Sequence, residues 1–289
     1  MSNFYNPDIG CQDRCGIFEI MKTIDQILSE GGNYGLTKNR VTKLRRNKNY
    51  YKDENVLSAV TFMLIDNFTQ REYMPENRYA HLRKAGTDNW DKFMELLGER
   101  PTGLYYCLLE QKLPNRYSLS RFNRKQWRDF SRGEGETQTD AIIFSKPDQF
   151  SDGLLCIAEA KLLSESGKGI ARDRFRDQIS RNVEMGIYLT RGRGSEQFNS
   201  FRFKFILITP VFFKKTRLMQ YREEFEKVKQ GEINLRYAWP NEIKNRIREE
   251  VKEMVHWITW EDIYNTVLRG VEKSGEIEAF FRARCLVDG

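Results

Sequence analysis

Two short apolar runs in the middle of the chain constrain its fold more than any other feature. Residues 139–145 read TDAIIFS and residues 154–161 read LLCIAEAK, each long enough for one strand. The connection between them, KPDQFSDG, contains Pro, Asp and Gly, which favour turns. We therefore expect two adjacent antiparallel strands at this point of the chain.

Three charged residues lie at the ends of these two expected strands. Asp140 begins the first strand, Glu159 lies near the end of the second, and Lys161 follows two positions later. Residues two apart on a strand share a face, so pairing of the strands can bring Asp140 beside Glu159. A charge at the end of an apolar strand is costly to bury, which indicates a purpose for it.

These residues suit a site for a hard metal ion. Two carboxylates, Asp140 and Glu159, and the backbone carbonyl of Ala160 would offer oxygen ligands, which favour Mg²⁺ or Mn²⁺ over zinc. Lys161 would then lie near the metal, where it could orient a water molecule or help to deprotonate it. The spacing alone is weak evidence, because Glu-x-Lys also occurs at 110–112, 242–244 and 250–252.

The other Glu-x-Lys sequences lack the same context. Those at 242–244 and 250–252 fall in stretches with helical periodicity, where such pairs are ordinary surface charges. Glu110 ends an apolar run, but its upstream partner would be Asp91, inside an expected helix. We rank Glu110 as the second candidate.

The remaining apolar patterns predict further helices and one more long strand. Thr259 and Asp262 have capping-box spacing, which predicts a strand that leads directly into a helix. The expected helices cover residues 17–30 (ended by Gly31 and Gly32), 54–68, 89–97 (closed by Gly98), 169–189, 214–230 and 241–254, and the strand covers 201–210.

The order of these motifs resembles the PD-(D/E)xK, or restriction-endonuclease-like, nuclease superfamily. TDAIIF, then CIAEAK, then a helix that carries Gln178, then a strand, match its pattern over roughly residues 54–270. The resemblance implies an α/β fold with a central mixed β-sheet flanked by helices, here with an N-terminal helical segment. It also implies that Asp140 and Glu159 hold the metal and that Lys161 lies beside the attacking water. The sequence departs from the pattern at Thr139, where proline is common.

The resemblance adds two more residues to the expected catalytic site. Many members carry a glutamate on the helix before the sheet, and Glu54 matches it; a glutamine on the helix after the Glu-x-Lys strand is frequent, and Gln178 matches that one. Each has an ordinary alternative. Glu54 could simply stabilise a helix N-terminus, and Gln178 could be an exposed helix residue.

The chain divides into two expected parts. Residues 1–53 form an N-terminal helical and basic segment, and residues 54–289 form the nuclease-like domain. The stretch 38–48 holds six basic residues and no acidic one. Both a solvated helix face and a phosphate-binding surface would explain such a run.

The overall charge favours a polyanionic partner. The net charge is +7, and basic residues concentrate in 112–132, where aromatic residues are interleaved, and in 168–204. The alternative is that the aromatic residues face the core and the cations face water. The candidates for nucleic-acid contact are Lys125, Arg128, Lys168, Arg172, Arg174 and Arg181.

The cysteines and hydropathy point to a cytoplasmic protein. The five cysteines are irregularly spaced and the N-terminus is polar, which fits a reducing compartment. His81 and His256 lie far from Cys11 and Cys15, which disfavours a structural zinc site. No run of 18 apolar residues occurs, so we expect no membrane-spanning helix.

The sequence thus predicts an Mg²⁺- or Mn²⁺-dependent endonuclease that hydrolyses DNA, of the restriction or phage-defence type. Two alternatives stay open: a nuclease that acts on RNA, and a catalytically silent module that binds nucleic acid or assembles with other proteins. A homodimer would suit double-strand cleavage, and a partner within a defence complex is also open.

Overall fold

The computed structural model describes residues 24–46, 54–66, 87–100, 105–113, 137–145, 153–162, 178–191, 201–215, 220–235, 239–271, 274–282, 284 and 286. The strands are β1 (Tyr105–Leu109), β2 (Lys112–Leu113), β3 (Thr137–Gln138), β4 (Ala141–Ser145), β5 (Gly153–Ala160), β6 (Phe201–Thr209) and β7 (Val255–Thr259). The helices are η1 (Glu30–Tyr34), α2 (Lys38–Arg45), α3 (Glu54–Ile65), α4 (Thr87–Leu96), α7 (Gln178–Arg191), α8 (Val211–Lys215), α9 (Gln220–Lys229), α10 (Asn241–Met254), α11 (Trp260–Ile263), the π-helical turn η3 (Tyr264–Leu268) and α12 (Ser274–Arg282).

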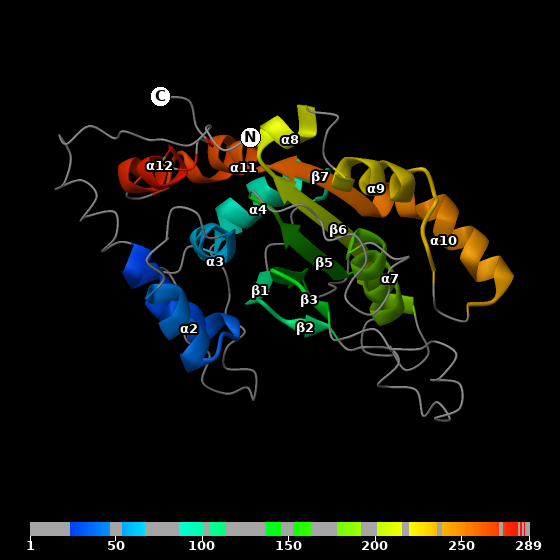
Figure 1. Ribbon diagram of the computed structural model, residues 1–289, viewed down its shortest axis with the longest axis horizontal. Helices are drawn as coiled ribbons and strands as arrows, with labels where there is room; N and C mark the ends of the chain where they lie inside the picture. The colour runs from blue at the N-terminus through cyan, green and yellow to red at the C-terminus, as the bar shows by residue number, and fades with distance from the viewer. Residues whose placement is uncertain are drawn as a thin grey trace.

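A five-stranded mixed sheet forms the centre of the fold, in the order β1-β4-β5-β6-β7 (Figure 1). β4 runs antiparallel to both of its neighbours, β1 and β5, whereas β5, β6 and β7 are parallel to one another. A separate two-stranded ribbon joins β2 to β3. The expected α/β class with a central mixed sheet and flanking helices is confirmed.

The predicted hairpin of β4 and β5 is also confirmed. Ala141 pairs with Ala158 and Ser145 pairs with Leu154 in an antiparallel register. One further step along this ladder places Asp140 opposite Glu159. The local apolar pattern and the turn residues were therefore sufficient to predict which strands pair.

Helices cover both faces of the sheet and give the protein two hydrophobic cores. One core unites α3, α4 and α12 with the inward residues of the sheet, and the other unites the sheet with α7, α9 and α10 (Figure 1). Side chains of β6 alternate between them: Ile206 and Ile208 enter the first core, and Phe205 and Leu207 enter the second. This period of two is the pattern of a strand that is covered on both sides.

The described part of the N-terminal segment packs into the first core. Ile27 and Leu28 are fully buried there together with residues of α3. The buried carboxylate of Asp66 accepts hydrogen bonds from the Tyr34 hydroxyl (2.8 Å) and from Trp90 Nε1 (2.9 Å), which ties this segment to α3 and α4. The boundary expected at residue 53 stays a prediction.

Most of the expected helices are found near their predicted positions. α3, α4, α9 and α10 match, and the capping box of Thr259 and Asp262 begins α11 directly after β7. The chain stays helical through Gly31 and Gly32, which lie in the 3-10 helix η1. This helix is capped at Gly35, whose φ of 81° suits glycine. The helix expected over 169–189 is α7 within the described residues, and 169–177 lie outside them. No helix among the described residues has the length and apolar character needed to cross a membrane.

Gly186 allows α7 to lie against β6. A Cβ atom at this position would come within 1.9 Å of the Phe203 ring. We expect Gly186→Ala to lower the free energy of unfolding by about 1–3 kcal/mol, because the helix or the ring must move to relieve the overlap. Urea denaturation would measure the change.

Gly275→Ala is the matched control. A Cβ atom at Gly275, in α12, would meet no other atom within 4 Å, so this variant should be as stable as the parent or slightly more stable. Equal loss of stability in both variants would contradict the packing argument.

Candidate functional site

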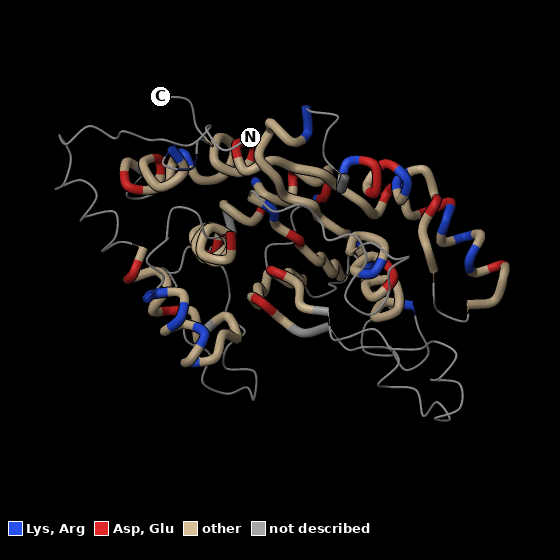
Figure 2. The backbone as a smooth tube through the Cα atoms, viewed as in Figure 1, with Lys and Arg blue, Asp and Glu red and all other residues tan. Residues whose placement is uncertain are grey.

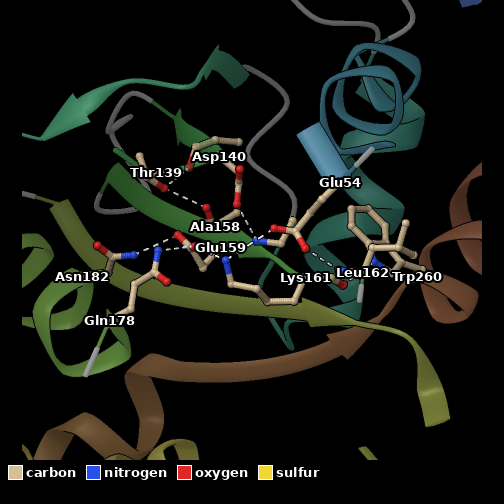
Figure 3. A network of polar contacts seen from close by, with 12 residues as sticks. Glu54, Thr139, Asp140, Ala158, Glu159, Lys161, Leu162, Gln178, Asn182 and Trp260 are labelled. Carbon is tan, nitrogen blue, oxygen red and sulfur yellow. Dashed lines mark hydrogen bonds and ion pairs between the residues drawn. The ribbon is translucent and has the colours of Figure 1, made fainter. Parts of the chain in front are cut away.

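Five residues expected in the catalytic site meet at the carboxyl end of β5. Glu54 comes from the start of α3, Asp140 directly precedes β4, Glu159 lies at the end of β5, Lys161 directly follows β5, and Gln178 begins α7 (Figure 3). In sheets with parallel strands, ligands commonly bind at this end of the strands. The geometry thus collects residues that are more than a hundred positions apart in the sequence.

Glu159 lies at the centre of the hydrogen-bond network. Its side chain is almost fully buried, and both of its oxygens accept hydrogen bonds. Oε1 accepts from Lys161 Nζ (2.8 Å) and from the Gln178 amide, and Oε2 accepts from Asn182 Nδ2 (3.1 Å). These donors offset much of the cost of burying the carboxylate.

Lys161 is fixed at its backbone and at its ammonium group. Its N–H donates to the carbonyl of Ile208 on β6 (2.8 Å), and its carbonyl accepts from Trp260 Nε1 (3.0 Å). Its Nζ lies 2.8 Å from Glu159 Oε1 and 3.5 Å from Glu54 Oε1. The ammonium group is therefore held between two carboxylates (Figure 3).

Glu54 does more than stabilise the start of its own helix. Its Oε2 accepts a hydrogen bond from the backbone N–H of Leu162 (2.7 Å), while Oε1 faces Lys161. The first turn of α3 is thus attached to the end of β5. Glu54 contributes a third carboxylate to the cluster.

Asp140 is oriented by the strand next to it. Its Oδ2 accepts from the Ala160 N–H (2.8 Å), and the neighbouring Thr139 hydroxyl donates to the Ala158 carbonyl (2.7 Å). Thr139 thereby ties the start of β4 to β5. The two contacts hold the Asp140 carboxylate toward Glu159 and Lys161.

The electrostatics of the cluster reflect an excess of negative charge. Burial raises the pKa of Asp140 well above its ordinary value, and the nearby Glu159 raises it further. Burial also raises the pKa of Glu159, although Lys161 opposes this effect. Burial alone would lower the pKa of Lys161, but Glu159, Glu54 and Asp140 together raise it, so the ammonium stays protonated. One cation thus faces three carboxylates.

The donor set fits a divalent cation with hard oxygen ligands. The expected ligands are the Asp140 and Glu159 carboxylates and the Ala160 carbonyl. The positive charge of a bound cation would lower the pKa of both acids and so offset the effects of burial and of neighbouring carboxylates. The described residues contain no group of three or more His, Cys, Asp or Glu side chains arranged to hold a metal ion. A site built on two carboxylates and a carbonyl, completed by water, is nevertheless of the kind that Mg²⁺ uses.

Asn182 is a site residue that the sequence analysis missed. It is fully buried one turn after Gln178 on α7, and its amide nitrogen donates to Glu159. Because an ionised carboxylate only accepts hydrogen bonds, this contact fixes which end of the amide faces Glu159. The Asn182 Oδ1 atom is buried without a hydrogen-bond partner among the described residues. The spacing from Gln178 of four residues, one face of a helix, was the available signal.

The predicted nucleic-acid contacts are mostly outside the described residues. Lys125, Arg128, Lys168, Arg172 and Arg174 all lie there. Arg181 is described, and it is buried in α7 with 4% of its surface exposed. A phosphate contact requires an accessible side chain, so the burial of Arg181 disfavours the role predicted for it.

The competing Glu-x-Lys sequences lie in other surroundings. Glu110 pairs with Arg40 through both carboxylate oxygens. Glu250 is partly exposed on α10, where it pairs with Arg191 and Arg246. Among the described residues, Glu159 is the Glu-x-Lys glutamate that joins a buried carboxylate cluster.

Comparison with known proteins identifies no relative. No protein-family model, curated protein or solved structure matches this chain. The mixed sheet with flanking helices therefore defines the fold only as α/β. Membership of the PD-(D/E)xK superfamily stays a prediction that rests on the site residues.

Replacing Asp140 by asparagine should stabilise the metal-free protein. Because burial raises the pKa of Asp140, the folded protein binds this proton more tightly than the unfolded chain does. The free energy of unfolding therefore falls as the pH rises from the ordinary carboxyl range through the raised pKa. We expect Asp140→Asn to gain about 0.5–2 kcal/mol at neutral pH in EDTA, measured by urea denaturation.

The pH dependence of this gain is the control. At acidic pH the parent carboxyl group is also protonated, so the two proteins should converge in stability. A gain of the same size at acidic and neutral pH would show that charge is not the cause. Asp25→Asn, which alters a half-exposed ion pair with Arg45, should not become more stable at neutral pH.

Proposed function

We propose that the protein is a metal-dependent nuclease that hydrolyses phosphodiester bonds in DNA. The observation that carries this proposal is the convergence of Asp140, Glu159 and Lys161 at the carboxyl end of β5, with Glu54 beside them. A cluster with excess negative charge and one fixed ammonium group suits a divalent cation and a phosphate ester. The proposal rests on these residues, because no comparison supplies a relative of known function.

The residues of the chain have distinct parts in the proposed reaction. Asp140, Glu159 and the Ala160 carbonyl would hold Mg²⁺ or Mn²⁺, which lowers the pKa of water and stabilises negative charge on phosphate. Lys161 is protonated, so it would donate a hydrogen bond to a phosphate oxygen or to the attacking water rather than accept a proton. Gln178 and Asn182 keep Glu159 oriented, and Glu54 keeps Lys161 in place. Attack of water oxygen on phosphorus then breaks one phosphorus–oxygen ester bond.

The basic helix α2 supports a nucleic-acid partner. The exposed cations are Lys38 and Lys43 on α2 and Arg46 directly after it, and none of them forms an ion pair with another described residue. α2 contains no acidic residue, and its Arg40 contacts Glu110 at the end of β1. A backbone of phosphates would be attracted to such a surface.

Cleavage should depend on Lys161 and on a divalent metal. We expect Lys161→Ala and Asp140→Asn to reduce the cleavage rate of plasmid DNA by about 100-fold or more, since charge stabilisation at the reacting phosphate is lost. Mg²⁺ or Mn²⁺ should support turnover, Ca²⁺ should support binding with little turnover, and EDTA should abolish cleavage.

The controls use the competing motifs and other substrates. Lys112→Ala and Lys244→Ala should cleave as the parent does. These lysines belong to the competing sequences Glu110-Gln-Lys112 and Glu242-Ile-Lys244, which are not part of the proposed centre. Undiminished activity in EDTA, or an active Lys161→Ala variant, would refute the proposed centre. Cleavage of tRNA but not of plasmid or single-stranded DNA would identify an RNA nuclease, and binding without cleavage would identify a silent module.

DNA binding should weaken with salt in proportion to the phosphate contacts made by α2. Replacing Lys38, Lys43 and Arg46 together by glutamine should reduce the slope of log affinity against log salt concentration by about 2. The matched control replaces Lys244, Arg248 and Lys252 on α10, on the opposite side of the sheet (Figure 2). Fluorescence anisotropy of a labelled duplex in EDTA would measure both slopes, and equal losses would mean that general charge, not α2, attracts DNA.

A further inference from the structure

Glu110 has an unusual backbone conformation beside the candidate site. Its φ is 49°, which lies in the left-handed region. Among the described residues, Glu110 is the only non-glycine residue with a positive φ. A side chain with a Cβ atom is sterically disfavoured there and adopts the conformation when its surroundings hold it. Its position, directly after β1, is also the turn toward β2.

The backbone of this turn is bonded to the segment that carries Asp140. The Glu110 N–H donates to the Asp140 carbonyl (2.9 Å), and the Thr139 N–H donates to the carbonyl of Gln111 (3.0 Å). These bonds continue the β1–β4 register two positions beyond its last pair, Leu109 with Ala141. The Glu110–Gln111 turn therefore sets where the backbone of Asp140 lies.

The Glu110 side chain is clamped by a helix that is distant in the sequence. Arg40 Nε and Nη2, on α2, donate to its two carboxylate oxygens in a bidentate pair, and the Glu110 side chain is only 7% exposed. The chain before α2 is close to the same turn, since a Cβ atom at Gly35 would lie 2.7 Å from the Gln111 amide. The strained turn is thus held both by its strand and by the N-terminal segment.

We infer that Arg40 and Glu110 are positioning residues for Asp140. The bidentate pair keeps Glu110 in its left-handed conformation, and the Glu110 N–H then fixes the backbone from which the Asp140 carboxylate extends. The catalytic consequence rests on the proposed nuclease function, whereas the structural link does not. Through this link the N-terminal segment takes part in the site without contacting the reacting phosphate.

The test compares Arg40→Gln, Glu110→Gln and the double variant with the parent protein. Hydrogen–deuterium exchange in EDTA should become several times faster at residues 137–141 in all three variants. In plasmid cleavage, kcat should fall by about 10- to 100-fold with KM changed less than twofold, because a small displacement of a reacting group is costly. The double variant should lose no more than either single variant, since each removes the same pair. Arg40→Lys keeps the charge without the fork and should recover part of kcat.

Asp25→Asn is the matched control, because it removes a second bidentate pair on α2. Arg45 donates to both Asp25 oxygens (2.7 and 2.6 Å), so both members of this pair belong to the N-terminal segment. This variant should leave the exchange at 137–141 and kcat unchanged. Equal effects of Asp25→Asn and Glu110→Gln, or unchanged exchange in Glu110→Gln, would overturn the inference.

The readouts also separate this inference from the proposed function. A parent protein that cleaves no nucleic acid would refute the nuclease, while faster exchange at 137–141 would still support the positioning link. An active parent whose Glu110→Gln variant merely melts at a lower temperature, with an unchanged kcat, would overturn the positioning role alone.

Discussion

The buried charge of Glu159 is the interaction on which the rest of the site depends. An ionised carboxylate at the end of a hydrophobic strand is costly unless it is paired and hydrogen-bonded. Lys161, Gln178 and Asn182 meet this requirement from two elements, and they fix the end of β5 relative to the start of α7. The close packing of α7 against β6 at Gly186 therefore also holds the two α7 residues that donate hydrogen bonds to Glu159.

The single charge of Lys161 does not neutralise the carboxylates around it, and this imbalance helps to raise the pKa of the acids in the cluster. Lys161 faces three carboxylates, so burial and mutual repulsion raise the pKa of Asp140 and of Glu159. A structural ion pair would need no such excess of acid. The excess makes the metal-free fold less stable than it could be at neutral pH, and a cation bound by these carboxylates, as proposed, would offset this cost.

Local sequence patterns predicted the elements, but not the contacts that join distant ones. The β4–β5 hairpin and the α11 capping box depend on neighbouring residues, so periodicity and turn chemistry were sufficient. The Trp260 bond to the Lys161 carbonyl spans 99 positions and the Arg40 pair with Glu110 spans 70. Such contacts follow from how helices and strands pack in three dimensions, for which one sequence carries no direct pattern.

The environment, rather than the motif, gives Glu-x-Lys its chemistry in this chain. Glu250 on α10 precedes Lys252 with the same spacing, but Arg246 and Arg191 offset its partial burial and lower its pKa, as in an ordinary surface ion pair. Glu159 is buried instead, its pKa is raised, and its lysine faces further carboxylates. The same three-residue pattern therefore yields a partly exposed ion pair on a helix and a buried carboxylate cluster at a strand end. The strand end differs because β4, α3 and α7 converge on it.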